Sequence, residues 1–321
     1  MEVNRFKNSF AENIFRFKYA QGPNDSWDAL VDRLVDDVCG TRGGTLQPLM
    51  SASDMKDLAE HMKRMAFLPG GRYLYYAGRQ FKAFNNCFLL RAEEDTREEW
   101  ANVTWRAMSC LMTGGGIGVD YSRLRPSGRI LQRTGGKASG PIPLMYGINE
   151  LGRQIMQGGS RRSAIYASLD SKHEDIPLFL RAKNWEDQQC GTSGLSLKQM
   201  KEQDFNFPAP LDMTNISVNY DDSAGLLTGN PVFLENCLQA MKTGEPGFSF
   251  NFGDKSNETL RNACTEVTSE DDSDVCNLGS INLGNIDSLE EFKAVVSLAS
   301  KFLVCGTLRA DLPYDKVYKV R

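Results

Sequence analysis

Histidine is the residue type that this 321-residue sequence has least of, with only His61 and His173. This scarcity argues against a histidine-rich metal site and against a nucleophile that a histidine activates. Acid–base chemistry would then come from carboxylates, from cysteines or from a cofactor. His61 lies in a helical pattern and His173 in a polar loop, where a solvated or hydrogen-bonded histidine is the simpler interpretation.

Three further absences narrow the class of protein. The sequence has no run of about 18 apolar residues, so no membrane span is expected. Its first 21 residues mix charge with phenylalanine and lack the apolar core of a signal peptide. The formal net charge is only -4, which gives no general affinity for nucleic acid or for anionic membranes. We therefore expect a cytoplasmic protein that binds neither a membrane nor nucleic acid directly.

Cysteine is present in moderate number but in no recognisable framework. No pair forms a C-x-x-C motif, and the spacings predict neither a zinc site nor, in a cytosolic chain of this size, a set of structural disulfides. Most of the thiols are expected to be small buried hydrophobic residues. The eight positions are Cys39, Cys87, Cys110, Cys190, Cys237, Cys264, Cys276 and Cys305.

Hydrophobic periodicity divides the chain into two predicted segments. Helices predicted over 25–40, capped by Asp25 or Ser26, and over 53–66 make residues 1–75 a helical N-terminal region. From 76 to 321, short strands alternate with helices, which predicts a parallel sheet with helical crossovers. The predicted strands are 87–90, 163–169, 214–220 and 247–251, and the predicted helices are 97–112, 144–157, 231–242 and 288–305.

Three polar or glycine-rich segments lie between these elements. Residues 113–120 are rich in glycine and predict either a close approach of backbone to a ligand or a plain turn after a helix. The loop 157–162 carries Arg161 and Arg162, which would meet a phosphate or a carboxylate, or be solvated. Residues 269–274 form a short acidic loop.

The most informative stretch is Asn262–Glu266, because it places an amide, a thiol and a carboxyl at alternate positions. In an extended chain these side chains share one face, whereas in a helix the middle one lies nearly opposite. The spacing therefore predicts an extended loop that presents Asn262, Cys264 and Glu266 to one pocket. Two more thiols lie in short stretches that contain several apolar residues. Cys87 lies within 85–90 and Cys276 within 275–283.

Taken together and in order, these motifs resemble the catalytic subunit of ribonucleotide reductase, most closely the adenosylcobalamin-dependent (class II) kind. The resemblance spans about residues 65–285 and implies an α/β fold, the first half of a ten-stranded α/β barrel: a parallel five-stranded half-barrel with a finger loop, preceded by helices. The supporting stretches are 68–78, 85–90, 114–126, 135–143, 158–169, 214–218, 244–251, 262–266 and 276–283.

The resemblance also implies how the chemistry is divided among the residues. Cys264 would carry a thiyl radical generated with adenosylcobalamin and would abstract the ribose 3′ hydrogen. Glu266 would take the 3′-OH proton, and Asn262 would orient Glu266 and the sugar. Cys87 and Cys276 would protonate the leaving 2′-OH, supply two electrons and end as a disulfide. The substrate would be a ribonucleoside di- or triphosphate, and a thioredoxin-like protein would restore the thiols.

Binding roles follow from the same resemblance. A deoxynucleoside triphosphate effector would bind near Glu94 and Arg125, with a homodimer interface completing that site, unless Arg125 is simply a surface arginine. The family's second half-barrel carries a phosphate loop, much of the cobalamin contact and a C-terminal cysteine pair. Because the pattern is interrupted at Arg321, we expect one half of a split or truncated enzyme, and in a split enzyme a separate chain would supply the other half. The residues that match the substrate-binding backbone are Gly71, Arg72, Asn86 and Gly116.

Three alternatives stay open at this point. The first is a class I catalytic subunit that uses a separate radical-carrying protein, although the N-terminal region is short for the ATP-binding cone of that class. The second is a non-catalytic nucleotide-binding or assembly subunit. The third is a glycyl-radical enzyme, whose barrel is similar but whose glycyl site lies in the C-terminal portion.

Overall fold

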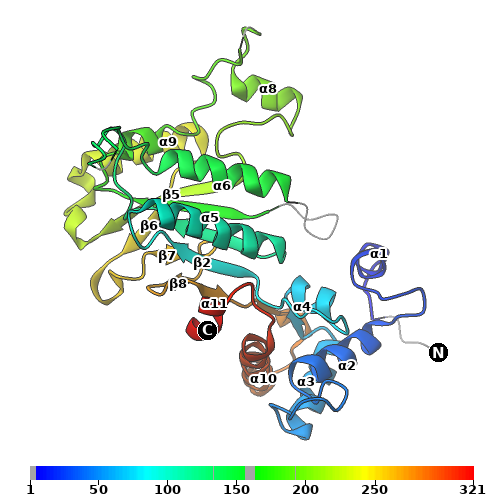
Figure 1. Ribbon diagram of the computed structural model, residues 1–321. Helices are drawn as coiled ribbons and strands as arrows, with labels where there is room; N and C mark the ends of the chain where they lie inside the picture. The colour runs from blue at the N-terminus through cyan, green and yellow to red at the C-terminus, as the bar shows by residue number, and fades with distance from the viewer. Residues whose placement is uncertain (1–4, 133, 156–162, 192) are drawn as a thin grey trace. The chain divides into compact units, whose positions relative to one another are not determined.

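The computed structural model describes residues 5–132, 134–155, 163–191 and 193–321. The chain divides into two compact units, whose elements are labelled in Figure 1. The first comprises Met1–Asn86, Cys276–Leu312 and Arg321, and we call it the helical unit. The second comprises Cys87–Val275 and Pro313–Val320, and we call it the sheet unit.

The helical unit consists mainly of helices, as the N-terminal pattern predicts. Ser26 caps α2 by accepting a hydrogen bond from the N–H of Ala29, which decides between the two predicted caps. Leu30 and Leu34 of α2 are completely buried, so the predicted apolar stripe forms the core. The helices are α1 (Ser9–Lys18), α2 (Trp27–Val38), α3 (Ala52–Lys63), α4 (Gly71–Tyr76), η4 (Leu283–Asn285) and α10 (Leu289–Arg309), and β1 (Phe67–Pro69) pairs antiparallel with β10 (Gly279–Ile281).

A six-stranded sheet organises the second unit. Its order is β6-β5-β4-β3-β2-β9, and every neighbouring pair from β2 to β6 runs parallel. The predicted parallel sheet is therefore confirmed. The strands are β2 (Cys87–Arg91), β3 (Gly116–Asp120), β4 (Ile165–Asp170), β5 (Thr214–Asp221), β6 (Gly247–Asn251) and β9 (Asp274–Cys276).

Helices connect the parallel strands, because a parallel pair cannot be joined by a tight turn. Helices α5 and α6 lie side by side over the sheet in Figure 1. The connecting helices are α5 (Arg97–Met112), α6 (Ile142–Gln154), α7 (Ile176–Leu180), α8 (Leu197–Gln203), η1 (Asp222–Ala224), η2 (Leu227–Gly229) and α9 (Pro231–Thr243). The unit ends with η3 (Gly253–Lys255), the strands β7 (Leu260–Arg261) and β8 (Thr268–Ser269), and helix α11 (Asp315–Val320).

One prediction about the sheet was wrong. The glycine-rich segment 113–120 is a turn only at its start, where Gly114 adopts a φ of +88°. Gly116–Asp120 forms β3, a completely buried strand between β2 and β4. Glycine is unfavourable in strands unless another backbone comes close, and the segment that does so here belongs to the candidate site.

Two other observations complete the fold. The predicted loop 157–162, with Arg161 and Arg162, lies outside the residues that the structure describes. Within the described residues, no helix combines the length and the apolar character needed to cross a membrane.

Candidate active site

The stretch that carries Asn262, Cys264 and Glu266 is the turn of a hairpin between β7 and β8, which pair antiparallel. Two hydrogen bonds to Asn262 close this turn. Its backbone carbonyl accepts from the N–H of Thr265 at 3.0 Å, and its side-chain Oδ1 accepts from the N–H of Val267 at 3.1 Å. Thr265 adopts a left-handed φ of +72°, which reverses the direction of the chain.

The prediction of an extended loop was therefore wrong. Asn262 is completely buried, whereas Cys264 and Glu266 are exposed at the turn. The physical reason is the asparagine, whose short amide readily bonds to nearby backbone and stabilises a turn. The buried Asn262 side chain therefore stabilises the hairpin from inside, whereas the Cys264 and Glu266 side chains are exposed to solvent.

Two glycines of β3 let the hairpin backbone lie directly against the sheet. A Cβ on Gly118 would stand only 1.8 Å from the carbonyl oxygen of Arg261. A Cβ on Gly116 would stand 2.9 Å from the Cβ of Ala263 and 3.2 Å from the Sγ of Cys87. The backbone that lies against these glycines therefore belongs to the protein's own hairpin and not to a ligand. This contact places the hairpin beside the buried Cys87 thiol.

Cys87 owes its place to the strand register. It is the first residue of β2, and the register pairs it with Gly116 at the start of β3. Its side chain is 6% exposed. The sheet unit thereby gathers Cys87, Gly116 and the hairpin that carries Cys264.

Arg261 anchors the base of the hairpin. Its guanidinium donates to the Oδ1 of Asn251 at 2.7 Å and to the carbonyl of Glu258 at 2.6 Å. Burial lowers the pKa of Arg261 below its ordinary value. The hairpin is therefore attached at its base by directed hydrogen bonds and along its length by the close contact with β3.

The other predicted residues lie in the helical unit, whose second segment begins at Cys276, the last residue of β9. Cys276 is buried, and its carbonyl accepts a hydrogen bond of 2.9 Å from the N–H of Asn86, the residue that precedes Cys87. Arg72 is 4% exposed, and its guanidinium lies 5.5 Å from the ring centre of Tyr76.

Gly71 is packed closely, because a Cβ there would stand 2.8 Å from the Tyr19 hydroxyl. The helical unit thus contains Gly71, Arg72, Asn86 and Cys276.

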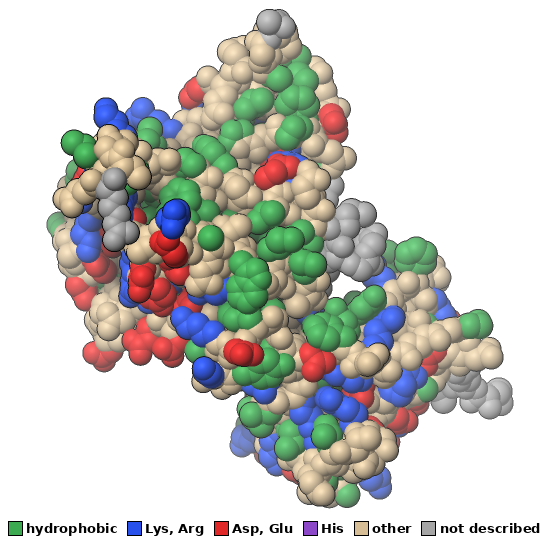
Figure 2. Space-filling view, in the orientation of Figure 1, with side chains coloured by type: hydrophobic (Ala, Val, Ile, Leu, Met, Phe, Trp, Pro, Cys, Tyr) green, Lys and Arg blue, Asp and Glu red, His purple; other side chains and the backbone are tan. Residues whose placement is uncertain are grey.

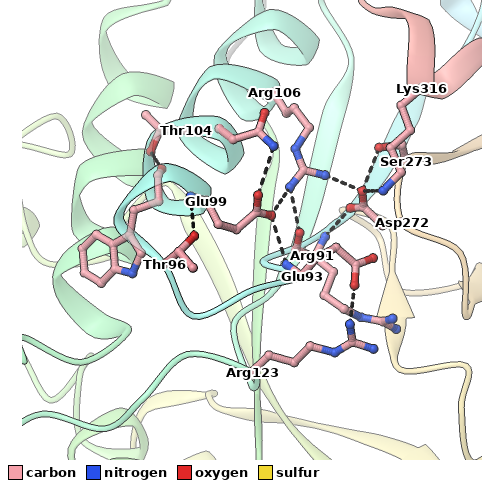
Figure 3. A network of polar contacts seen from close by, with 12 residues as sticks. Arg91, Glu93, Thr96, Glu99, Thr104, Arg106, Arg123, Asp272, Ser273 and Lys316 are labelled. Atoms are coloured by element: carbon pink, nitrogen blue, oxygen red, sulfur yellow. Dashed lines mark hydrogen bonds and ion pairs between the residues drawn. The ribbon is translucent and has the colours of Figure 1, made fainter. Parts of the chain in front are cut away.

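The acidic loop 269–274 contains a feature that sequence reasoning missed. The Asp272 side chain is completely buried and accepts from the N–H of Arg91 at 2.7 Å, from Lys316 at 2.5 Å and from the Arg106 guanidinium (Figure 3). Arg106 also pairs with Glu99 at 2.6 Å.

The N–H of Ser273 donates to the carbonyl of Leu89 in β2 at 2.7 Å. Together these contacts hold the residues before β9 against β2. A run of acidic residues usually indicates a solvated loop, and only the distant Arg106 and Lys316 reveal the buried carboxylate.

The two residues predicted for the effector site line different cavities. Arg125 donates to the Oδ2 of Asp95 at 2.6 Å and lines a cavity of about 320 Å³ that Lys137 also borders. Glu94 is exposed and lines a cavity of about 600 Å³ with Trp105. Asp95, the partner of Arg125, is nevertheless the chain neighbour of Glu94.

In the described part of the chain, no group of three or more histidine, cysteine, aspartate or glutamate side chains is arranged to hold a metal ion.

Comparison with known proteins gives one family. The family described as "Ribonucleotide reductase, barrel domain" matches residues 85–205 and 238–320. A vitamin B12-dependent ribonucleoside-diphosphate reductase of Mycobacterium tuberculosis is 27% identical over 301 residues, which cover 88% of this chain and 42% of that protein. A protein of the same name from Thermoplasma acidophilum is 26% identical over 81% of this chain and 36% of its own length.

The similarity extends to relatives whose names do not mention vitamin B12. The ribonucleoside-diphosphate reductase large chain of Cryptosporidium parvum is 26% identical over 76% of this chain and 34% of its own length. This chain thus spans less than half the length of the curated relatives described here.

Proposed function

The chain belongs to the ribonucleotide reductase family, since the barrel-domain match covers more than half of it, and on this premise we propose that it contributes to the radical reduction of ribonucleotides to 2′-deoxyribonucleotides. The proposed radical carrier is Cys264. The supporting observation is the hairpin that exposes Cys264 while β3 holds the neighbouring Ala263 beside the Sγ of Cys87.

The first chemical step proposed for this chain is hydrogen-atom transfer at a sulfur. An S–H bond and the ribose C3′–H bond have similar strengths, so a thiyl radical on Cys264 would exchange a hydrogen atom with C3′ almost reversibly. The thiol must therefore meet the sugar directly, and its exposure at a tight turn fits this need. The turn also fixes its position, as Thr265 and Val267 both bond to Asn262.

Glu266 is the proposed general base. It is exposed two residues after Cys264, and a carboxylate there would accept the 3′-OH proton and promote loss of the 2′-OH. Asn262 acts as a positioning residue in this proposal, because its buried side chain holds the N–H of Val267, which follows Glu266 directly.

Cys87 and Cys276 are the proposed source of two electrons. One of the thiols would protonate the leaving hydroxyl, and their oxidation would join the two sulfurs as a disulfide. Disulfide formation requires Cα atoms about 4.4–6.8 Å apart. The hydrogen bond from Asn86 to the carbonyl of Cys276 supports the assignment, because Asn86 is the chain neighbour of Cys87.

The cofactor proposed for radical generation is adenosylcobalamin, the cofactor implied by the B12-dependent relatives. When bound, it supplies radical chemistry by homolysis of its Co–C bond. The residue of this chain that fits such an oxidant is Cys264, because its thiol is exposed rather than enclosed by hydrocarbon. The Cryptosporidium relative supports a second candidate, in which a separate radical-carrying protein oxidises Cys264.

The proposed partners follow from the same function. They are a ribonucleoside di- or triphosphate, a deoxynucleoside triphosphate effector, a thioredoxin-like reductant and a chain that supplies the second half-barrel. A second copy of this chain is also proposed. It would cover the hydrophobic side chains that gather over α5 in Figure 2, where Trp105, Met108 and Met112 are exposed.

The decisive experiment measures turnover with the Cys264→Ser variant. The chain is combined with the remaining half-barrel of a B12-dependent relative, adenosylcobalamin, a dithiol reductant and cytidine di- or triphosphate. We expect the variant to fold normally, because residue 264 is exposed, and to lose turnover by more than about a thousandfold. Turnover by the variant near the wild-type rate would remove the radical assignment.

Two further measurements separate the alternatives. Cys87→Ser and Cys276→Ser should each prevent repeated cycles, and normal cycling by either variant would refute the pair. Omitting adenosylcobalamin should abolish product formation if the B12-dependent assignment holds. Product formed without it, but only with a radical-carrying protein, would establish the second candidate instead.

A further inference from the structure

Two buried cysteines that the proposed function does not use meet in the helical unit. Cys39 follows the last residue of α2 and is completely buried. Cys305 lies in α10 and is 5% exposed. The two thiols share a hydrogen bond where α2 and α10 pack together. They come from nearly opposite ends of the sequence, so no local pattern reveals the contact.

The surroundings of the pair favour a thiolate on Cys305. The hydrogen bond from the Cys39 thiol, with help from the positive charge of Arg309, lowers the pKa of Cys305 to about 7 despite its burial. The same hydrogen bond raises the pKa of Cys39. A thiolate beside a thiol is the arrangement that makes a cysteine nucleophilic toward oxidants.

Arg309 is held beside the pair by the loop that follows α2. Its guanidinium donates to the carbonyl of Gly40 at 2.7 Å and to that of Gln47, so its charge is fixed next to Cys39. Arg42 joins the same cluster by donating to the carbonyls of Asp37 and Arg309, both at 3.4 Å. Arg309 thus places a positive charge beside the thiols, and Arg42 contacts the same end of α10.

A tyrosine closes the cluster on another side. Tyr73 is completely buried, and its hydroxyl makes no hydrogen bond in the described structure. A Cβ on Gly306, the neighbour of Cys305, would stand 2.0 Å from that hydroxyl. Burial first, and then the nearby Cys39 and Cys305, raise the pKa of Tyr73, which keeps it a neutral phenol. The thiols are therefore enclosed by packed side chains, with only a small part of Cys305 exposed.

We propose that Cys39 and Cys305 form a redox-active dithiol, which reacts with hydrogen peroxide and closes to a disulfide between α2 and α10. This inference is independent of ribonucleotide reduction, because neither cysteine belongs to the proposed reaction. The disulfide would fix the N-terminal helices to α10 under oxidising conditions and release them when a thiol reductant opens it.

The reaction balances with peroxide as the two-electron oxidant. The Cys305 thiolate attacks one oxygen of hydrogen peroxide, the O–O bond breaks, and hydroxide leaves as Cys305 becomes a sulfenic acid. The sulfur of Cys39 then attacks the sulfur of Cys305, the S–O bond breaks, and the second oxygen leaves as water. That water carries the Cys39 proton, and the hydroxide forms the other water with the proton that Cys305 released when it ionised. Two thiols and one peroxide thus give one disulfide and two waters.

The experiment treats the full native 321-residue chain with hydrogen peroxide and maps its peptides by mass spectrometry without reduction. We expect the peptides containing Cys39 and Cys305 to appear linked, with the loss of two hydrogen atoms. We also expect a higher thermal midpoint that dithiothreitol reverses, because a disulfide across most of the chain restrains the unfolded state. Glutathione disulfide should react much more slowly than peroxide, because Cys305 is 5% exposed.

Four single-residue variants test whether the link requires these two thiols and the charge of Arg309. Cys305→Ser should remove both the link and the midpoint shift, while Cys39→Ser should leave a sulfenic acid on Cys305 that dimedone traps. Cys110→Ser, at a buried cysteine of the sheet unit, should retain the link. Arg309→Gln should slow peroxide-dependent closure about tenfold, since its charge favours the thiolate.

Three results would overturn the proposal. The first is peroxide-treated chain in which both thiols remain alkylatable after unfolding. The second is Cys305 oxidised to sulfinic acid without any link to Cys39. The third is a link that forms only after the chain is unfolded in urea. If either serine variant fails to fold, Cys39→Ala and Cys305→Ala replace it in the same peptide map.

Discussion

The loop that enters β9 and the hairpin between β7 and β8 belong to the same sheet unit, yet opposite means hold them in place. Asp272 fixes the first by charge: one buried carboxylate meets Arg106, Lys316 and a backbone N–H. Gly118 helps to fix the second by the absence of a side chain, since the Arg261 carbonyl occupies the space of its missing Cβ.

The difference predicts which kind of substitution would destabilise each segment. A buried charge is costly without its partners, so the β9 loop should respond to the removal of charge. A close backbone contact leaves no room for added atoms, so the hairpin should respond to added volume. Each segment leads to a proposed catalytic cysteine, Cys276 in the first case and Cys264 in the second.

The largest expected effect comes from Asp272→Asn. The variant keeps the shape of the side chain but leaves the buried Arg106 without one of its two counter-charges. We expect the free energy of unfolding of the sheet unit to fall by about 4 kcal/mol. Urea unfolding followed by tryptophan fluorescence measures this change.

The matched control is Asp271→Asn, at the neighbouring exposed carboxylate. It should change stability by less than about 0.5 kcal/mol. Equal effects of the two substitutions would mean that the loop is held by its overall acidity and not by the contacts of Asp272.

The next largest effect is expected for Gly118→Ala, which tests the hairpin. The added methyl group would collide with the backbone of Arg261 and should cost about 3 kcal/mol. Gly147→Ala in α6 is the control, because no atom lies within 4 Å of the added Cβ and alanine favours a helix. The same urea titration compares them, and an unchanged Gly118→Ala midpoint would contradict the contact.

Asp212 provides a test of how a buried, paired carboxylate contributes to stability as the pH changes. Burial opposes its ionisation, but hydrogen bonds from Arg153, Lys201 and Asn149 outweigh burial and lower its pKa to about 2. Because the folded pKa lies below the unfolded value near 4, its contribution is present above pH 4. That contribution, about 2 kcal/mol, is lost as the pH falls from about 4 toward 2.

The measurement compares urea midpoints of the wild type and Asp212→Asn between pH 7 and pH 2. The two curves should differ most at neutral pH and converge in acid. A constant difference over the whole range would show that Asp212 stabilises the fold through packing alone.

The smallest effect is expected for Asn262→Ala. The variant removes the acceptor for the N–H of Val267 and should cost about 1 kcal/mol, while Asn257→Ala, at an exposed position, should cost less. Iodoacetamide labelling of Cys264 in the native chain gives a second readout. Faster labelling in the Asn262 variant would show that the turn has loosened, and unchanged labelling would show that other contacts define it.

Much of the fold could be predicted from the sequence because the signals are local. Apolar periodicity and the Ser26 cap place α2, and runs such as 87–90 and 214–220 place β2 and β5. The same local reasoning failed for β3, because glycine in a strand is favourable only when another segment covers it. It also failed for Asn262–Glu266, where a side-chain-to-backbone bond produces a turn.

By itself, the sequence determined the alternation of strands and helices and the set of thiols, amide and carboxyl that suggests radical chemistry. Only the tertiary structure decided that Gly116 and Gly118 receive the hairpin, that Asp272 is buried and that Cys39 meets Cys305. The physical reason is the distance along the sequence over which each interaction acts. Hydrophobic periodicity acts over a few residues, whereas close packing and ion pairing depend on segments that the chain brings together only after it folds.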